Sequence, residues 1–260
     1  LIVDLDRPVA ESVADGGFEG HNASITWRHL LQQTSEWEGE LFGIPDWIDR
    51  GRQVTGSAAR AESQVGGSAA LAEERRALQA PGSFWEYNDV RVNRTALALL
   101  RVYGHALPVV LRQRVMDPIG ASDTWQWHGY STSRVEVAGE TVESVSGGAH
   151  WGGGLWISTQ DHARFGHLYL NRGRWDDRVI LDETWIEETL QPCALQAGYG
   201  LMWWLNHRDN VSRVAGEAAF AARGAGGNVV FVDPESETVI VVRWCRDPRA
   251  AIDGFLEALA

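Results

Sequence analysis

One ten-residue segment, Pro81–Val90, constrains this chain more than any other. A Pro-Gly turn leads into a short aromatic run, and Tyr87 and Asp89 then open an apolar segment that continues to Leu100. The apolar spacing predicts a helix that ends near Gly104. The turn before this helix therefore carries a phenol and a carboxylate, at a place where a loop can present both rigidly to a cleft.

Composition limits the class of protein. The 260 residues are enough for a substantial core, and 44% hydrophobic with 22% charged residues is ordinary for a globular protein. No apolar run approaches the roughly 20 residues that a membrane helix needs. The net charge of -12 argues against a nucleic-acid footprint, which would be a basic patch. We therefore expect neither a membrane segment nor a nucleic-acid partner.

Cysteine and tryptophan usage adds two open questions. Cys193 and Cys245 are too few for a disulfide framework and lack the spacing of metal ligands. They can form one pair or remain two unrelated buried thiols. The 13 tryptophans can line a cleft for a partly apolar ligand, or they can serve as core and cover.

The first residues read as the middle of a protein sequence. Leu1 is not preceded by a methionine, and neither a charged n-region nor a signal-like apolar stretch follows it. We expect that an N-terminal part of the protein is missing from this chain. The sequence assigns no compartment, because bacterial cytoplasm and periplasm fit equally well, and it assigns no oligomeric state.

A short helix is predicted just after the first turn. Ser24 or Thr26 can cap it, and its apolar positions Trp27 and Leu30 share a face. His29 lies within this helix, where it can act as a general base or, in the commoner case, as a structural hydrogen-bonding group. Residues 51–71, rich in glycine, serine and alanine, predict a long surface excursion.

The rest of the chain predicts helices around antiparallel strands. Ala138-Gly139 marks a hairpin, and Ser158 with Asp161 forms a capping box at the start of a helix. No βαβ repeat is present, so the fold class is α+β rather than a Rossmann sheet. The other predicted elements are a helix over 107–115 that ends at Asp117-Pro118, strands over 200–206, 228–233 and 238–244, and a final helix over 249–259.

Taken in this order, the segments resemble serine hydrolases of the β-lactamase and penicillin-binding-protein type, including class C β-lactamase-type esterases. The family's tyrosine motif is usually Tyr-x-Asn, matched here by residues 87–89; the segments 24–35, 117–124 and 220–228 match others. The resemblance implies a β-lactamase/transpeptidase-like fold, an antiparallel sheet flanked by helices. It implies one domain over 1–260, N-terminally truncated, with a helical lobe at roughly 24–125 and a sheet-forming part at roughly 135–260.

The resemblance gives Tyr87 a catalytic role. In the family the tyrosine lies near a Ser-x-x-Lys nucleophile, and an adjacent ammonium favours the phenolate, so Tyr87 can relay a proton to or from the leaving group. Asp89 replaces the usual asparagine and cannot donate a hydrogen bond when it is ionised. It can hold the family's lysine by charge, or it can simply cap the following helix. The change disfavours β-lactam amide recognition and favours esters or other small amides.

The third family element is the strand that lines the cleft opposite the serine. Its counterpart here contains Arg223, Gly224 and Ala225. By the resemblance, the small residues let the strand approach a substrate, and the N–H of Ala225 supplies one oxyanion donor. Arg223 can bind a substrate carboxylate with two hydrogen bonds, or it can be an ordinary salt-bridged arginine that faces away.

A glycine run adds three further cleft candidates, His150, Trp151 and Gly153. Gly152–Gly154 reads as a tight backbone passage near the cleft floor. His150 can face the site, although a structural or exposed histidine is the commoner case. No metal site is predicted, and the resemblance implies no cofactor.

The nucleophile itself is missing from these residues. The chain contains no lysine, so all 23 basic residues are arginines. Ser57-Ala58-Ala59-Arg60 has the spacing of Ser-x-x-Lys, but arginine stays protonated and cannot act as a base. The resemblance implies an esterase or small-amide hydrolase that works through an acyl-enzyme, with these 260 residues inactive on their own. The alternative is a scaffold that has lost catalysis and serves as a binding or regulatory module.

Overall fold

The computed structural model describes residues 2, 4–48, 50, 76–144 and 154–259. The chain forms two compact units. The first contains Leu1–Ala106 and His128–Gly154, and the second contains Leu107–Trp127 and Leu155–Ala260. Each unit is described in turn.

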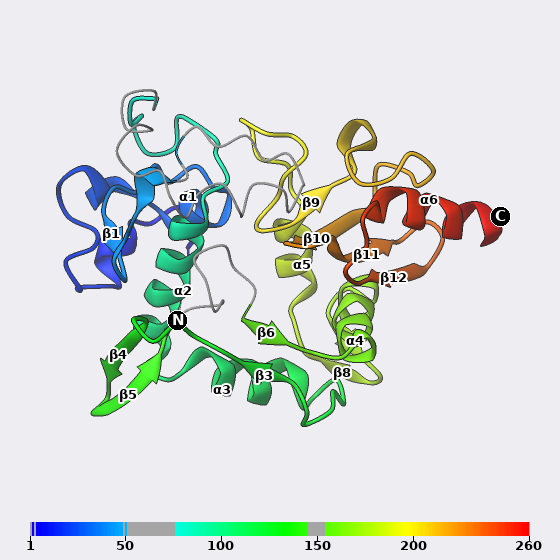
Figure 1. Ribbon diagram of the computed structural model, residues 1–260, viewed down its shortest axis with the longest axis horizontal. Helices are drawn as coiled ribbons and strands as arrows, with labels where there is room; N and C mark the ends of the chain where they lie inside the picture. The colour runs from blue at the N-terminus through cyan, green and yellow to red at the C-terminus, as the bar shows by residue number, and fades with distance from the viewer. Residues whose placement is uncertain (1, 3, 49, 51–75, 145–153, 260) are drawn as a thin grey trace. The chain divides into compact units, whose positions relative to one another are not determined.

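Two helices organise the first unit (Figure 1). The short helix α1, Trp27–Leu31, packs against α2, Asp89–Tyr103. Helix α2 ends because Gly104 takes the left-handed conformation, with φ of 66°, that glycine adopts most easily. The apolar faces of the two helices meet in one core, whose members include Trp27, Leu30, Val90, Leu97 and Ala98.

Short strands and 3-10 turns complete the first unit. Strands β4, Arg134–Val137, and β5, Glu140–Glu143, form an antiparallel hairpin. Ala138 and Gly139 both have positive φ, as the predicted two-residue hairpin turn requires. The remaining elements are β1 (Glu40–Leu41) paired with β2 (Ile44–Pro45), and the 3-10 turns Val9–Glu11, Gly20–Ser24 and Asp46–Ile48.

The second unit is built on a four-stranded antiparallel sheet in the order β12-β11-β10-β9. The strands are β9 (Trp204–Leu205), β10 (Phe220–Gly224), β11 (Asn228–Asp233) and β12 (Thr238–Val242). Side chains alternate between the faces of a strand. Ala221 and Phe231 accordingly pack with Ile252 of helix α6, Pro248–Leu259, which lies beside β11 and β12 (Figure 1).

The opposite face of this sheet is covered by helix α4, Thr159–Leu170. Phe220 and Val232 pack with Tyr169 of this helix. Gly166 allows the close approach, since a Cβ there would lie 2.7 Å from Val239. The Ser158 hydroxyl accepts a hydrogen bond from the Asp161 N–H, which confirms the predicted cap of α4. Helices on both faces of an antiparallel sheet confirm the α+β class.

Smaller elements surround this layered centre. They are α3 (Leu107–Leu111), which continues as a π-helical turn over Arg112–Met116, α5 (Glu183–Thr189), β3 (Gln126–Trp127) paired with β6 (Leu155–Trp156), and β7 (Arg174–Trp175) paired with β8 (Arg178–Val179). The predicted 107–115 helix therefore changes its hydrogen-bond pattern halfway. The predicted 200–206 strand is shorter, because only Trp204 and Leu205 pair with β10.

The two units divide the chain differently from the predicted lobe boundary between 125 and 135. Residues 107–127 belong with the sheet because Met116, Ile119 and Trp125 pack against Leu168 of α4. Residues 128–154 belong with the first unit, where Arg101 of α2 donates a hydrogen bond to the Glu136 carbonyl oxygen at 2.6 Å.

Two predicted side-chain questions have answers here. Both cysteines are free thiols, Cys193 buried and Cys245 half-buried, so the disulfide alternative is not realised. The tryptophans do not share one environment, because Trp27 and Trp203 are buried in the cores while Trp156 and Trp244 are largely exposed. Among the described helices, none has the length and hydropathy to cross a membrane.

Candidate functional site

The loop that carries Tyr87 is held from both sides by backbone hydrogen bonds. The N–H of Glu86 donates to the Gln33 carbonyl oxygen at 3.0 Å, and the N–H of Asn88 donates to the Gln33 side-chain oxygen at 3.2 Å. Both neighbours of Tyr87 are therefore anchored to the segment after α1. Tyr87 itself is half-buried between them. The structure confirms that this phenol lies in a loop immediately before α2.

Asn88, and not Asp89, caps helix α2. Asn88 has the extended backbone of an N-cap, its Oδ1 accepts from the Arg91 N–H at 3.1 Å, and its Nδ2 donates to the Asp46 carbonyl oxygen at 2.9 Å. The N-cap alternative for Asp89 is therefore wrong. Asp89 is the first helical residue and is buried, which places its carboxylate in the first turn of α2.

Buried ion pairs surround the Tyr87 loop. Glu36, fully buried, accepts hydrogen bonds from Arg91 at 2.7 Å and from Arg76 at 2.6 Å. Burial alone would raise the pKa of Glu36, but the hydrogen bonds from Arg76 and the charge of Arg91 outweigh it and lower the pKa to about 2. Arg76 also pairs with Glu86, and Arg91 with Asp46 at 3.4 Å. Each of these carboxylates therefore has a guanidinium partner.

The segment beneath the loop stores backbone strain. Gln33 and Glu36 have φ of 61° and 46°, left-handed values that residues other than glycine rarely adopt. Each costs of order 1–3 kcal/mol and persists only where the surroundings enforce it. Both residues are 1% exposed or less. The strain lies in the residues that anchor Tyr87.

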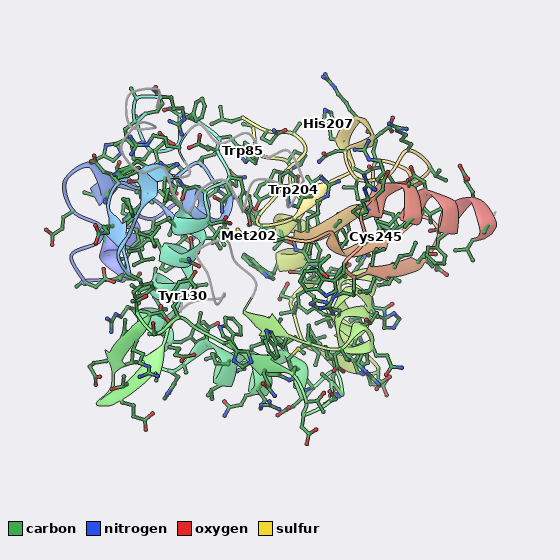
Figure 2. The ribbon with its side chains drawn as sticks, viewed as in Figure 1. Trp85, Tyr130, Met202, Trp204, His207 and Cys245 are labelled. Carbon is green, nitrogen blue, oxygen red and sulfur yellow. The ribbon has the colours of Figure 1, made fainter. Side chains whose placement is uncertain are left out.

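A second phenol lies beside Asp89. The Tyr130 hydroxyl accepts a hydrogen bond from Asn93 Nδ2 at 2.9 Å, and Asn93 follows Asp89 by one helical turn. Burial and the Asp89 charge raise the pKa of Tyr130 to about 12, against the opposing effect of the Asn93 hydrogen bond. Figure 2 labels Tyr130 below α2. The sequence interpretation missed this residue, because Tyr130 lies 37 residues from Asn93 and no local pattern links the two.

His29 has a structural role in this arrangement. Its Nδ1 accepts a hydrogen bond from the Thr26 N–H at 3.3 Å, while the Thr26 hydroxyl accepts from the His29 N–H at 3.2 Å, so the pair forms a reciprocal cap of α1. Gly82 packs over the ring, where a Cβ would lie 2.6 Å from Nε2. Burial lowers the pKa of His29 and disfavours the charged ring.

The other predicted site residues belong to the second unit. Arg223 lies near the end of β10, donates to the Asn210 carbonyl oxygen, and stands over the Trp204 ring at 5.4 Å from its centroid. Within the described part of the chain it has no carboxylate within 4.0 Å. Burial of its guanidinium and the adjacent charge of Arg249 lower the pKa of Arg223. The salt-bridge alternative for Arg223 is not realised among these residues.

The turn after β10 shows where glycine is needed. Gly226 and Gly227 have φ of 78° and 72°, and a Cβ on Gly227 would lie 1.9 Å from the Cys245 carbonyl oxygen. Gly224 has ordinary room, because a Cβ there would lie 3.6 Å from its nearest neighbouring atom, so its own unit does not require glycine at this position. The Ala225 carbonyl oxygen accepts from Asn228 Nδ2 at 2.7 Å. The oxyanion role of the Ala225 N–H stays a prediction.

The structure brings the predicted residues together in two groups, Tyr87 with Asp89 in the first unit and Arg223 with its neighbours in the second. His150, Trp151 and Gly153 lie outside the described residues, as does the rejected Ser57–Arg60 segment. Across the ranges that the structure describes, no three His, Cys, Asp or Glu side chains gather in a way that can hold a metal ion.

Comparison with known proteins places this geometry in a family. The Beta-lactamase family model matches residues 2–258, nearly the whole chain. Among curated proteins, none matches the chain significantly.

Solved structures share the fold at low sequence identity. Simvastatin synthase from Aspergillus terreus superposes with a TM-score of 0.62 at 17% identity, over 99% of this chain and 77% of its own. The octameric penicillin-binding protein homologue from Pyrococcus abyssi gives 0.61 at 19%, over 99% and 60%. A D-stereospecific amidohydrolase from Streptomyces sp. gives 0.54 at 16%, over 92% and 74%.

These likenesses fix the fold, and the family model fixes the family. The chain spans 60% of the Pyrococcus protein and also 60% of a Bacillus anthracis structure of the same fold. The antiparallel sheet between α4 and α6 is therefore the β-lactamase/transpeptidase-like sheet that the sequence predicts. The chain belongs to the Beta-lactamase family, whose members with this fold include hydrolases.

Proposed function

We propose that the protein is a serine-dependent acyl hydrolase that cleaves small esters or amides through an acyl-enzyme, with Tyr87 as its proton-transfer group. The observation that carries the proposal is the fixed position of Tyr87. Its two neighbours are hydrogen-bonded to Gln33, and buried ion pairs hold that segment in a strained conformation. Backbone strain in the residues that anchor a half-buried phenol is typical of a functional position.

The chemistry follows from the residue types. A phenolate, favoured by a nearby ammonium, can take the proton of an attacking serine hydroxyl, and the phenol formed in this way can return the proton to the leaving group. Asp89 follows Tyr87 by two residues at the start of α2, and Tyr130 lies near Asp89, where its raised pKa of about 12 keeps this second phenol protonated and able to donate. We assign substrate binding to Tyr130 and proton transfer to Tyr87.

The substrate class rests on the family and on Asp89. A solved structure of the same fold is named an amidohydrolase. Asp89 is an acceptor when ionised, so it cannot donate to a substrate carbonyl as an amide side chain does. This favours esters and small amides over β-lactams. The 260 residues contain no Ser-x-x-Lys, so the proposal requires a nucleophile from sequence outside them.

The test is hydrolysis of p-nitrophenyl acetate and of the matching p-nitroanilide by the full-length protein. Tyr87→Phe should lower kcat/KM by about a hundredfold or more, the usual loss for a positioned acid or base. Tyr103→Phe is the matched control, because Tyr103 is exposed at the far end of the same helix. An equal rate in Tyr87→Phe and the parent protein would remove Tyr87 from the mechanism.

The second candidate function is a binding module without catalysis, which the lack of Ser-x-x-Lys in these residues favours. One measurement distinguishes the hydrolase from the binding module. Intact mass after rapid quenching shows the added acyl group on an acyl-enzyme. No adduct and no turnover above the Tyr87→Phe background would establish the binding module instead.

A further inference from the structure

The second unit contains an open cavity of about 670 Å³ next to the start of α6. Its wall comes from residues 194–198, from Trp204, residues 207–210 and Arg213, and from Arg249. Trp204 and His207, both labelled in Figure 2, lie in this wall with Arg208 and Arg213. All of these residues belong to one unit, so the cavity is complete within it.

Buried amides fix the shape of this wall. Asn206, 1% exposed, donates to the Ala215 and Gly216 carbonyl oxygens, and its Oδ1 accepts from the Val211 and Ser212 N–H groups at 2.9 Å. Asn210 Nδ2 donates to the carbonyl oxygens of Gly198 and Leu205, which ties the loop to the facing segment. The cavity is therefore part of the folded unit and not a gap between loose loops.

The aromatic part of the wall is equally fixed. The Trp204 ring meets the buried Tyr199 ring edge-on, with centroids 5.0 Å apart and planes at 82°. Arg223 stacks over the same indole. An aromatic surface next to guanidinium groups suits the apolar part of a small organic anion.

The charge of the cavity is unbalanced. Arg208, Arg213 and Arg249 line it, and Arg223 lies directly behind Asn210. Among the described residues, none of these four guanidinium groups has a carboxylate oxygen within 4.0 Å. The whole chain nevertheless has a net charge of -12, so acidic partners are plentiful elsewhere. A group of four arginines without carboxylate partners is therefore not explained by a shortage of acidic residues in the chain.

Two of these arginines share a single neutral acceptor. Arg223 and Arg249 both donate to the carbonyl oxygen of Asn210, Arg249 at 2.8 Å. A carbonyl oxygen cannot neutralise two like charges; desolvation, and with it the nearby Arg249 charge, lowers the pKa of Arg223. An anion bound next to this pair would relieve the repulsion and use the remaining N–H donors.

The acidic groups nearby do not fill this role. Asp253 is occupied, because its Oδ1 accepts from the Ser212 hydroxyl at 2.6 Å and from the Arg213 N–H at 3.0 Å. Asp209 lies in the wall and is exposed, without an ion pair to the four arginines. Arg208 and Asp209 both have positive φ, of 50° and 58°, so the backbone that presents them is strained.

We propose that this cavity binds the oxyanion group, carboxylate or phosphate, of a small organic anion, with Arg249 and Arg213 as its principal ligands and Trp204 as its apolar wall. The assignment uses no residue of the Tyr87 loop and does not rest on the proposed hydrolase function. It gives the second unit a ligand site of its own.

Isothermal titration calorimetry of the full-length protein with inorganic phosphate and, separately, with succinate tests the proposal. We expect saturable binding of at least one probe, weakened by added NaCl because the contacts are ionic and partly exposed. Arg249→Gln should weaken binding by about tenfold or more, as expected for the loss of a charge-assisted hydrogen bond. Binding of phosphate alone, or of succinate alone, identifies which oxyanion the cavity takes.

Two further variants complete the design. Arg213 is exposed, so Arg213→Gln should fold normally and also weaken binding if Arg249→Gln fails to fold. Arg114→Gln removes the same charge from an exposed position on the π-helical turn of the same unit and should leave affinity unchanged. No saturable binding of either probe, or equal weakening by Arg114→Gln, would overturn the proposal.

Discussion

Arginines serve opposite purposes in the two units. Next to the Tyr87 loop, Arg76 and Arg91 converge on the buried carboxylate of Glu36, and each charge has a partner. Next to β10, Arg223 and Arg249 converge on a neutral carbonyl oxygen. The first arrangement uses the positive charge internally, to hold a loop in place. The second leaves the positive charge available to a ligand.

The largest expected effect is the loss of a compensated charge. Arg91→Met should destabilise the protein by about 3 kcal/mol, the lower end for a broken buried pair, because Glu36 and Asp46 lose a shared buried partner while Arg76 still contacts Glu36 and Arg50 still contacts Asp46. Arg249→Gln should change the unfolding free energy by about 1 kcal/mol or less, since it removes one hydrogen bond to a carbonyl group. Urea denaturation of both variants measures the contrast, and similar losses would end the distinction between the two regions.

The paired region should also carry a pH dependence. The pKa of Glu36 is lowered from 4.5 to about 2 on folding, so its stabilisation is fully present above pH 4.5 and is lost as the pH falls towards 2. The contribution of Glu36 to the free energy of unfolding that is lost over this pH range is about 3 kcal/mol. Urea midpoints from about pH 6 down to about pH 3 should fall less steeply in Glu36→Gln than in the parent protein.

Arg249→Gln provides the comparison for this measurement. Because no carboxylate pairs with Arg249 among the described residues, this variant should keep the pH slope of the parent protein. A slope in Glu36→Gln equal to that of the parent would show that Glu36 does not contribute it.

The last comparison lies within the second unit and concerns the turn that shapes the end of β10. Gly227→Ala should cost about 1–3 kcal/mol, because φ is positive there and the added Cβ would meet the Cys245 carbonyl oxygen. Gly224→Ala has room for its Cβ and should be close to neutral. Thermal unfolding of the two variants compares them, and equal costs would mean that the turn geometry is not what positions this strand.

Local features were well predicted from the sequence. The Ser158 cap, the Ala138-Gly139 hairpin and the stop at Gly104 each depend on a few neighbouring residues, so their residue types suffice. For α1 the sequence left Ser24 and Thr26 as alternatives, and Thr26 is the cap. The alternative in which Asp89 caps α2 was wrong, because Asn88 is the cap. Asparagine and aspartate are almost equally good caps, and the choice depends on the Asp46 carbonyl oxygen, which binds Asn88 from 42 residues away.

Non-local features were beyond the sequence. Tyr130 contacts Asn93 of α2 from the segment between β3 and β4, and nothing in its own neighbourhood marks it. The alternatives for Arg223 did not include a second arginine, because the approach of Arg249 depends on α6 packing against the sheet. The buried pairs of Glu36 likewise join segments 40 and 55 residues apart.

The α+β class and the loop that presents Tyr87 follow from periodicity, caps and short motifs, and the family follows from the resemblance of motifs that occur in the family's order. Which charges are compensated depends on the tertiary structure. Ion pairing depends on distances of a few ångströms between side chains that are remote in sequence, and those distances are set by the packing of helices and strands rather than by any local pattern. The same residue type therefore anchors a loop in one unit and lines an open cavity in the other.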